Sequence, residues 1–223
     1  MDVHIHGHAG ARVLVFPTSK GWTREWEDQG MMRALADHLQ HGWVQLWAVS
    51  SVDEESWYAD WKRLPDRADW ARRYDQYLYH ELLPCMDHRN GNGFTIVAGA
   101  SFGAFHALSF GLRHPDRVQR ILALSGLCDI RRFTRGWLDA TAYALNPWSF
   151  IPNEHDAARL ALLRRQDIIL ATGRDDVLAG QNRAFSGMLW DKGIGNALRL
   201  WDGWSHDWPY WQRMLRLYLR GHD

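Results

Sequence analysis

The amino-acid sequence predicts an α/β protein with a mostly parallel sheet and helices on both faces. Two observations carry this prediction. Short apolar runs typical of buried strands alternate along the chain with amphipathic patterns typical of helices. Turn-forming residues follow the apolar runs, as expected where strands end in loops. A length of 223 residues allows one large core, and no internal repeat or linker divides residues 1–223, so we expect a single domain.

Six compact apolar runs and one alternating segment predict the strands. The alternating segment lies at Val3–Ile5 and is typical of an edge strand. The apolar runs lie at Arg12–Phe16, Val44–Val49, Thr95–Ala98, Ile121–Leu124, Ile168–Ala171 and Leu198–Trp201.

Helical spacing of apolar residues predicts the covering layers. One long helix is expected to carry Trp70, Tyr74 and Leu82 on one face and to end at Pro84. Further helices are expected at Met31–Gln40, from Phe102 to Leu112, at Arg183–Lys192 and at Tyr210–Tyr218. Residues 50–65 read as a long loop. Residues 127–166 show no strand pattern and are expected to form an insertion of helices and loops near the active-site face.

Composition limits the classes of partner. Basic and acidic residues balance at 26 each, so nothing in the net charge favours a nucleic acid or a membrane surface. No apolar run approaches the roughly 18 residues of a membrane span, and the N-terminus does not resemble a signal peptide. Cys85 and Cys128 are too few for a disulfide framework, so we expect reduced thiols and a cytoplasmic protein.

Three histidines, His4, His6 and His8, alternate along the first predicted strand and would share one face. One interpretation is a metal site. The other is a polar row facing solvent, which we favour because we identify no acidic or cysteine partner for these histidines. We therefore expect no metal.

A serine stands between a strand and a helix in the segment Gly99-Ala100-Ser101-Phe102-Gly103. The segment matches G-x-S-x-G, the nucleophile elbow of α/β-hydrolases, whose context is strand, sharp turn and helix. Ser101 must occupy a strained turn so that its hydroxyl stands clear of the backbone. Gly99 and Gly103 are required because a Cβ at either position would collide with a neighbouring strand or helix. The elbow predicts a three-layer α/β-hydrolase fold with a serine nucleophile.

A serine hydroxyl needs a base, usually a histidine oriented by a carboxylate. In α/β-hydrolases the acid and then the histidine follow the serine along the chain, each in a loop after a strand. His206 follows the last predicted strand, and Asp175 and Asp176 follow the strand before it. Adjacent aspartates point in different directions, so only one reaches His206. We predict Asp176, with Asp175 as the alternative.

Two backbone N–H groups should stabilise the negative oxygen that develops during acyl transfer. One is predicted at Phe102, the residue after the nucleophile. The other should come from the loop Pro17–Gly21, which follows the first core strand. Pro17 has no N–H, so Thr18 or Ser19 must supply it.

Several tryptophans fall in loops expected near the catalytic face. Trp57, Trp204 and Trp208 are predicted to bind substrate through an apolar pocket for the acyl or aromatic group. The alternative is that these large rings fill gaps between the loops and the core.

Several segments resemble one known family. They are Val15–Gly21, Ser51–Tyr58, Gly99–Gly103, Leu112–Asp116 and His206–Pro209, and together they span nearly the whole chain. The chain resembles the putative esterase family, which includes esterase D, S-formylglutathione hydrolase and the mycolyltransferases. It is most similar to a group of small bacterial esterases.

The resemblance implies Ser101 as nucleophile, His206 as base and Asp176, three residues after Gly173, as the orienting acid. Many relatives carry His-Gly where this chain has Phe16-Pro17, so the second oxyanion donor stays open. The expected activity is hydrolysis of a small-molecule carboxylic ester through an acyl-enzyme, with no metal or organic cofactor. An acyltransferase using an alcohol acceptor and a non-catalytic binding protein are the alternatives. The natural ester is open, and so is assembly into a homo-oligomer.

Overall fold

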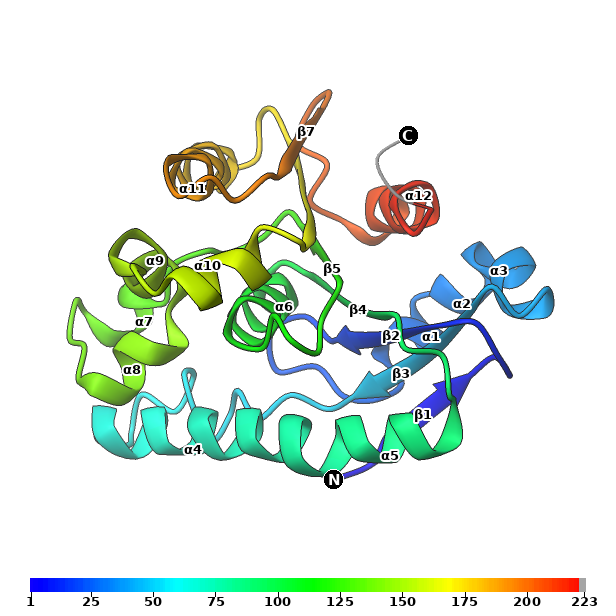
Figure 1. Cartoon of the computed structure of the whole chain (residues 1–223), viewed down its shortest axis with the longest axis horizontal. Helices are drawn as coiled ribbons and strands as arrows, with labels where there is room; N and C mark the ends of the chain where they lie inside the picture. The colour runs from blue at the N-terminus through cyan, green and yellow to red at the C-terminus, as the bar shows by residue number, and fades with distance from the viewer. Residues whose placement is uncertain (221–223) are drawn as a thin grey trace.

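The computed structural model describes residues 1–220 and contains a sheet of seven strands in the order β1-β3-β2-β4-β5-β6-β7 (Figure 1). Strand β1 pairs antiparallel with β3, and the other neighbouring strands pair in parallel. The predicted mostly parallel sheet is thereby confirmed. The strands are β1 Val3–His6, β2 Ala11–Phe16, β3 Val44–Val49, β4 Thr95–Ala100, β5 Arg120–Leu124, β6 Asp167–Gly173 and β7 Ala197–Trp201.

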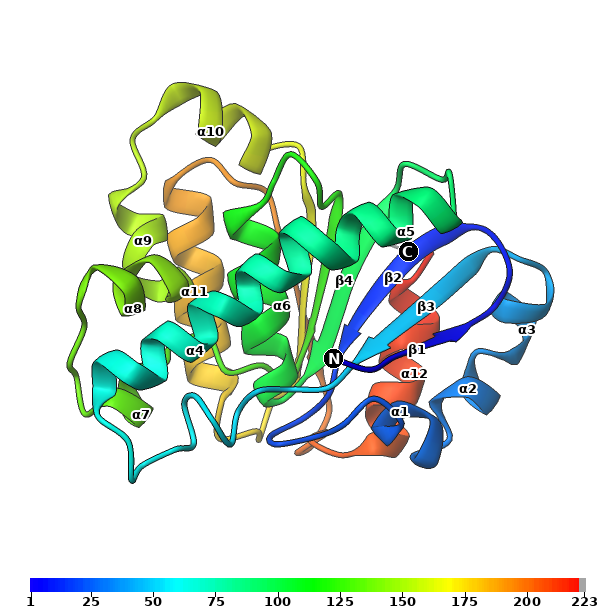
Figure 2. The ribbon, with the colours of Figure 1, turned by 90° about the horizontal axis from the view of Figure 1, so that it is seen from below.

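Helices cover both faces of this sheet, which gives three layers. The helices are α1 Glu25–Asp28, α2 Met31–Ala34, α3 Ala36–Gln40, α4 Leu64–Tyr77, α5 Leu83–Arg89, α6 Phe102–Arg113, α7 Arg131–Thr134, α8 Ala140–Leu145, α9 Pro147–Phe150, α10 Ala157–Leu163, α11 Ala179–Asp191 and α12 Trp208–Tyr218. The π-helical turn η1 is Leu78–Leu82, and the 3₁₀ turn η2 is Ile151–Asn153. Helices α1 to α3 and α12 lie on one face, while α4, α5, α6 and α11 lie on the other (Figures 1 and 2).

The core explains why the strands read as continuous apolar runs. In β2, Leu14 and Phe16 pack toward α4 and α6, whereas Val13 and Val15 pack with residues of α2 and α12. Successive side chains of a strand point to opposite faces, and here both faces are covered by helices. The positions from Val13 to Phe16 are therefore all apolar, and the period-two alternation of a half-exposed strand is absent from this part of β2.

Three predicted helices differ from the structure, and one of them, predicted at Arg183–Lys192, is α11 and begins earlier, at Ala179. Met31–Gln40 was expected as one helix, but it is divided into α2 and α3 at Leu35, whose φ of −104° and ψ of 13° leave the helical region. The long helix does not end at Pro84, because it continues through η1 into α5. A proline inside a helix lacks the N–H and collides with the carbonyl four residues before it. The wide turn η1 directly precedes Pro84 and accommodates the ring.

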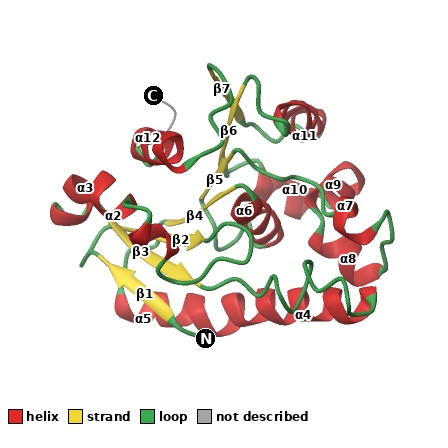
Figure 3. Ribbon diagram, turned by 180° about the vertical axis from the view of Figure 1, so that it is seen from behind, coloured by secondary structure: helices red, strands yellow, loops and turns green. Residues whose placement is uncertain are grey.

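Residues 127–166 connect β5 to β6 and carry the helices α7 to α10, with no strand in this described segment. Helix α8 packs against α4 and α6, and α9 packs against α6. Figure 3 shows the four helices gathered beside α6 and the end of α4. The segment therefore thickens the layer that contains α6. In the part of the chain that the structure describes, no helix is both long enough and apolar enough to cross a membrane.

Candidate active site

Ser101 occupies the sharp turn between β4 and α6. Its φ of 56° and ψ of −116° are strained for a residue with a side chain, and its N–H donates to Leu124 O at 2.8 Å. A Cβ on Gly99 would lie 2.1 Å from Gly103 O, and one on Gly103 would lie 2.3 Å from Pro17 O. The two glycines are thus required by close backbone approach, as the sequence pattern predicted.

Ser101, His206 and Asp176 form a continuous chain of contacts. His206 Nε2 lies 3.1 Å from Ser101 Oγ, and His206 Nδ1 lies 2.8 Å from Asp176 Oδ2. The two aspartates after β6 have opposite environments, because Asp176 is 5% exposed whereas Asp175 is exposed to solvent. The backbone N–H of Asp175 donates to Gly203 O at 3.1 Å. The structure brings together the three residues that the sequence selected, with Asp176 rather than Asp175 facing the imidazole.

The carboxylate of Asp176 is held by two further polar groups besides His206. Thr172 Oγ1 donates to Oδ2 at 3.1 Å, and Leu178 N–H donates to Oδ1 at 2.9 Å. Burial opposes ionisation, but the hydrogen bonds from His206, Leu178 and Thr172 outweigh it and hold the pKa of Asp176 below its usual range. The carboxylate therefore stays charged at neutral pH.

The loops that carry the acid and the histidine meet through close backbone contact. A Cβ on Gly173 would lie 2.1 Å from Trp204 O, so only glycine permits this approach. Ser125, at the end of β5, donates through Oγ to Ser205 O at 2.9 Å, and Trp211 Nε1 donates to Ser125 Oγ at 3.1 Å. Ser125 thereby ties the residue before His206 to helix α12. Its position after a buried strand was the available sequence signal for this role.

The loop Pro17–Gly21 is fixed by carboxylates from two other segments. Glu25 accepts both the N–H and the hydroxyl of Thr18, each at 2.6 Å. Asp53, fully buried, accepts from Lys20 N–H and from His106 Nε2, each at 2.8 Å. Glu25, Asp53 and His106 were not predicted from the sequence as partners of this loop.

These contacts bear on the second oxyanion donor, which the sequence left open between Thr18 and Ser19. The N–H of Thr18 is already bonded to Glu25, so it is directed away from a reacting carbonyl. Ser19 is the remaining candidate, and its Oγ lies 2.7 Å from the hydroxyl of Tyr58. Phe102 is the first residue of α6, where an N–H has no acceptor within its own helix.

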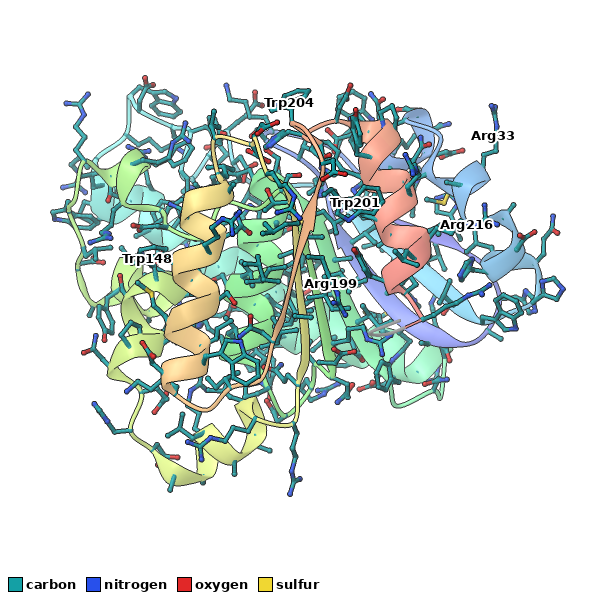
Figure 4. The ribbon with its side chains drawn as sticks, turned by 90° about the horizontal axis from the view of Figure 1, so that it is seen from above. Arg33, Trp148, Arg199, Trp201, Trp204 and Arg216 are labelled. Atoms are coloured by element: carbon teal, nitrogen blue, oxygen red, sulfur yellow. The ribbon has the colours of Figure 1, made fainter. Side chains whose placement is uncertain are left out.

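The predicted substrate-binding tryptophans lie in three different environments. Trp204 is 52% exposed, and its ring stacks on His206 with 5.7 Å between centroids. Figure 4 shows Trp204 in the loop that follows β7. Trp208 packs edge-on against Trp26 of α1 and Trp211 of α12. Trp57 is 1% exposed. Substrate contact by these residues stays a prediction.

A cleft lies beside the elbow. Tyr58 and Phe133 line it, and their rings both contact Phe102, at 5.1 Å between centroids in each case. Trp57 lies at its buried side, and Arg132 and Arg135 make the lining basic. Through these ring contacts with Phe102, the cleft adjoins the turn that carries Ser101.

Comparison with known proteins places these features in context. The chain is 28% identical over 137 residues to the acetyl esterase of Caldicellulosiruptor saccharolyticus. That match covers 54% of this chain and 51% of the relative, so the chain spans about half the length of the curated relative that it matches.

Solved structures show the same fold at low identity. A ferulic acid esterase superposes with a TM-score of 0.71 at 21% identity and covers 94% of this chain and 83% of its own. An S-formylglutathione hydrolase from Agrobacterium tumefaciens gives a TM-score of 0.74 at 13% identity, with coverage of 98% and 86%. The predicted α/β-hydrolase fold is confirmed.

A family model described as putative esterase matches residues 6–220, which include every strand after β1 and all the helices described above. The match agrees with the family that the sequence segments resemble. This chain therefore belongs to the putative esterase family.

Proposed function

We propose that this protein is a serine carboxylic-ester hydrolase that works through an acyl-enzyme. One observation carries the proposal: a strained, partly exposed serine contacts a histidine at 3.1 Å, and that histidine contacts a buried carboxylate at 2.8 Å. This arrangement is the one that turns a weakly nucleophilic hydroxyl into an effective nucleophile. Membership of an esterase family supports the same conclusion.

In the proposed mechanism, Ser101 Oγ attacks the ester carbonyl while His206 Nε2 takes the hydroxyl proton. Asp176 keeps the proton of His206 on Nδ1 and stabilises the imidazolium that forms. The tetrahedral adduct collapses as His206 protonates the leaving alcohol, which leaves an acyl group on Ser101. A water molecule, deprotonated by His206, then attacks the acyl group, and as this second adduct collapses His206 returns the proton to Ser101 Oγ and the acid is released. No metal or organic cofactor enters these steps.

The negative oxygen of the adduct is proposed to accept hydrogen bonds from the backbone N–H groups of Phe102 and Ser19. Phe102 suits this role because it begins α6, where the helix dipole adds positive potential. Ser19 takes the second position because the N–H of Thr18 is bonded to Glu25. The cleft lined by Tyr58 and Phe133 is proposed to hold the substrate beside Ser101.

Acetyl esters are the first substrates to test, because the curated relative is an acetyl esterase. Ser101→Ala should lower kcat/KM for an activated acetyl ester on the order of 10⁴-fold or more, since it removes the nucleophile. Ser101 lies in a turn and not in a core cluster, so circular dichroism and the Tm should be nearly unchanged. Turnover by the folded variant within a few-fold of the wild type would contradict the proposal.

A further inference from the structure

A second cluster of chemically active side chains lies away from the triad, between the edge strand β1 and helix α1. His4 and His6 alternate on β1, so their side chains share one face of the sheet. Their partners across the ladder, Ala48 and Leu46 of β3, pack into the core beneath α2 and α12. Both imidazoles therefore lie on the side of the sheet that carries α1, and Glu27 of α1 reaches them.

The three residues are arranged as metal ligands. One imidazole nitrogen from each histidine and one carboxylate oxygen of Glu27 all lie within 4.8 Å of one another. Tetrahedral zinc has bonds of about 2.0–2.1 Å, which separates its ligand atoms by about 3.4 Å. The ligand atoms would have to move closer together by roughly an ångström to reach this separation. Rotation of the three side chains, which lie at the edge of the sheet, would bring them closer.

An independent observation marks the same place. Nε2 of His6 is buried and has no hydrogen-bond partner within the described residues. Buried polar atoms are nearly always paired, because leaving one unpaired costs roughly 1–3 kcal/mol. A bound cation would satisfy this nitrogen. Glu27 has one competing contact, since Arg24 Nε lies 3.6 Å from its Oε2, which is too long for a good hydrogen bond.

We propose that His4, His6 and Glu27 bind a divalent transition-metal ion, with Zn²⁺ as the best match. Two imidazoles and one carboxylate form a donor set that zinc accepts, with water in a fourth position. The cluster corrects the expectation that the histidine row merely faces solvent. That expectation assumed that no acid lay nearby, whereas folding brings Glu27 to the row and leaves His8, which lies beyond the end of β1, outside the cluster.

The proposed ion would be a structural metal that links β1 to α1, and it would take no part in ester hydrolysis. Strand β1 lies at the edge of the described sheet and pairs with β3 on one side, so a bond to α1 would anchor its other side. Helix α1 also carries Trp26, whose Nε1 donates to Phe16 O at 3.1 Å, and begins with Glu25, which holds Thr18. Metal binding would thus stabilise the edge of the sheet and the segment that leads from β2 into α1.

The test is titration of the chelator-treated, metal-free full-length chain with ZnCl₂, followed by calorimetry and by thermal unfolding. We expect one saturable site and a Tm higher by roughly 5–10 °C at a free Zn²⁺ concentration about 100-fold above Kd. His6→Ala and Glu27→Gln should each weaken binding at least about tenfold, because each removes one ligand. His8→Ala is the matched control from the same row and should bind as the wild type does.

The variants also separate this site from adventitious binding elsewhere. Glu27→Gln keeps the size of the side chain, so it tests the ligand even if His6→Ala disturbs β1. The proposal is wrong if the wild type shows no saturable Zn²⁺ binding. It is equally wrong if Glu27→Gln and His6→Ala both bind Zn²⁺ with wild-type affinity, or if His8→Ala loses as much affinity as they do.

Discussion

Asp175 and Asp176 are neighbours in the chain with different surroundings. Asp176 is buried and faces His206, whereas the side chain of Asp175 is exposed. Asp176→Asn should therefore lower kcat/KM on the order of 10⁴-fold, because an amide favours the wrong tautomer of His206. Asp175→Asn, the matched control, should change kcat/KM less than about threefold. A larger loss in Asp175→Asn would transfer the orienting role to that residue.

The same carboxylate should leave a signature in acid stability. The folded-state pKa of Asp176 lies below its usual value, so the unfolded chain binds this proton more readily. Its stabilising contribution is complete above the unfolded pKa of about 3.9 and is lost as pH falls through the lower folded pKa. The Tm of the wild type should fall more steeply between about pH 5 and pH 3 than that of Asp176→Asn. If Tm fell with pH equally steeply in the wild type and in Asp176→Asn, the hydrogen bonds to Asp176 would not lower its pKa as described.

At the level of elements, the loop Pro17–Gly21 depends on carboxylates supplied from elsewhere. Buried Asp53 accepts from both Lys20 N–H and His106, and an asparagine has only one acceptor oxygen for the two donors. Asp53→Asn should lower kcat roughly tenfold or more with little change in KM, because the loop is proposed to serve the transition state. Glu54→Gln, which changes the adjacent exposed acid, is the control.

A loss confined to KM in Asp53→Asn would argue against this role, and so would an equal loss of kcat in Glu54→Gln. Thermal unfolding of both variants separates the effect on the loop from a general loss of stability. Because a loss of folded protein would also lower the apparent kcat without changing KM, kcat is calculated per active site, counted from the acyl-enzyme that each variant forms.

The predictability of the elements follows from what each one is packed against. Strands such as Val44–Val49 were predicted with the bounds of the structure because both faces are buried, which leaves a mostly apolar run. Helix α1, at four residues, is too short to show a period, and it was missed. The continuation of the helix beyond Pro84 was missed because a π-helical turn leaves no sequence pattern as clear as the proline that follows it.

At the level of the whole molecule, those residues of the candidate site were predictable that directly follow a strand of the parallel sheet. Ser101, Asp176 and His206 each follow a parallel strand, and parallel strands deliver their carboxyl ends to one edge. Glu25 and Asp53 were not predictable, because each acts through a contact that only the packing of separate segments creates. Glu27 beside the histidines of β1 belongs to the same group.

The two proposed sites make different predictions for chelation. The triad needs no metal, so a strong chelator should leave the initial rate of ester hydrolysis at 25 °C unchanged. The same treatment should lower the Tm of protein purified with bound Zn²⁺, because it removes the ion from His4, His6 and Glu27. Activity that vanished with chelator and returned with Zn²⁺ would overturn the serine mechanism.

The most direct test of the central claim is to trap the acyl-enzyme and find its attachment point. The protein is mixed with a slowly hydrolysed activated ester, quenched in acid and digested, and the acylated peptide is sequenced by mass spectrometry. The account predicts one acyl group per chain, attached to Ser101, with none on the Ser101→Ala variant and accumulation in His206→Ala slowed on the order of 10³-fold or more. Acylation of another residue, or an equal yield in Ser101→Ala, would contradict it.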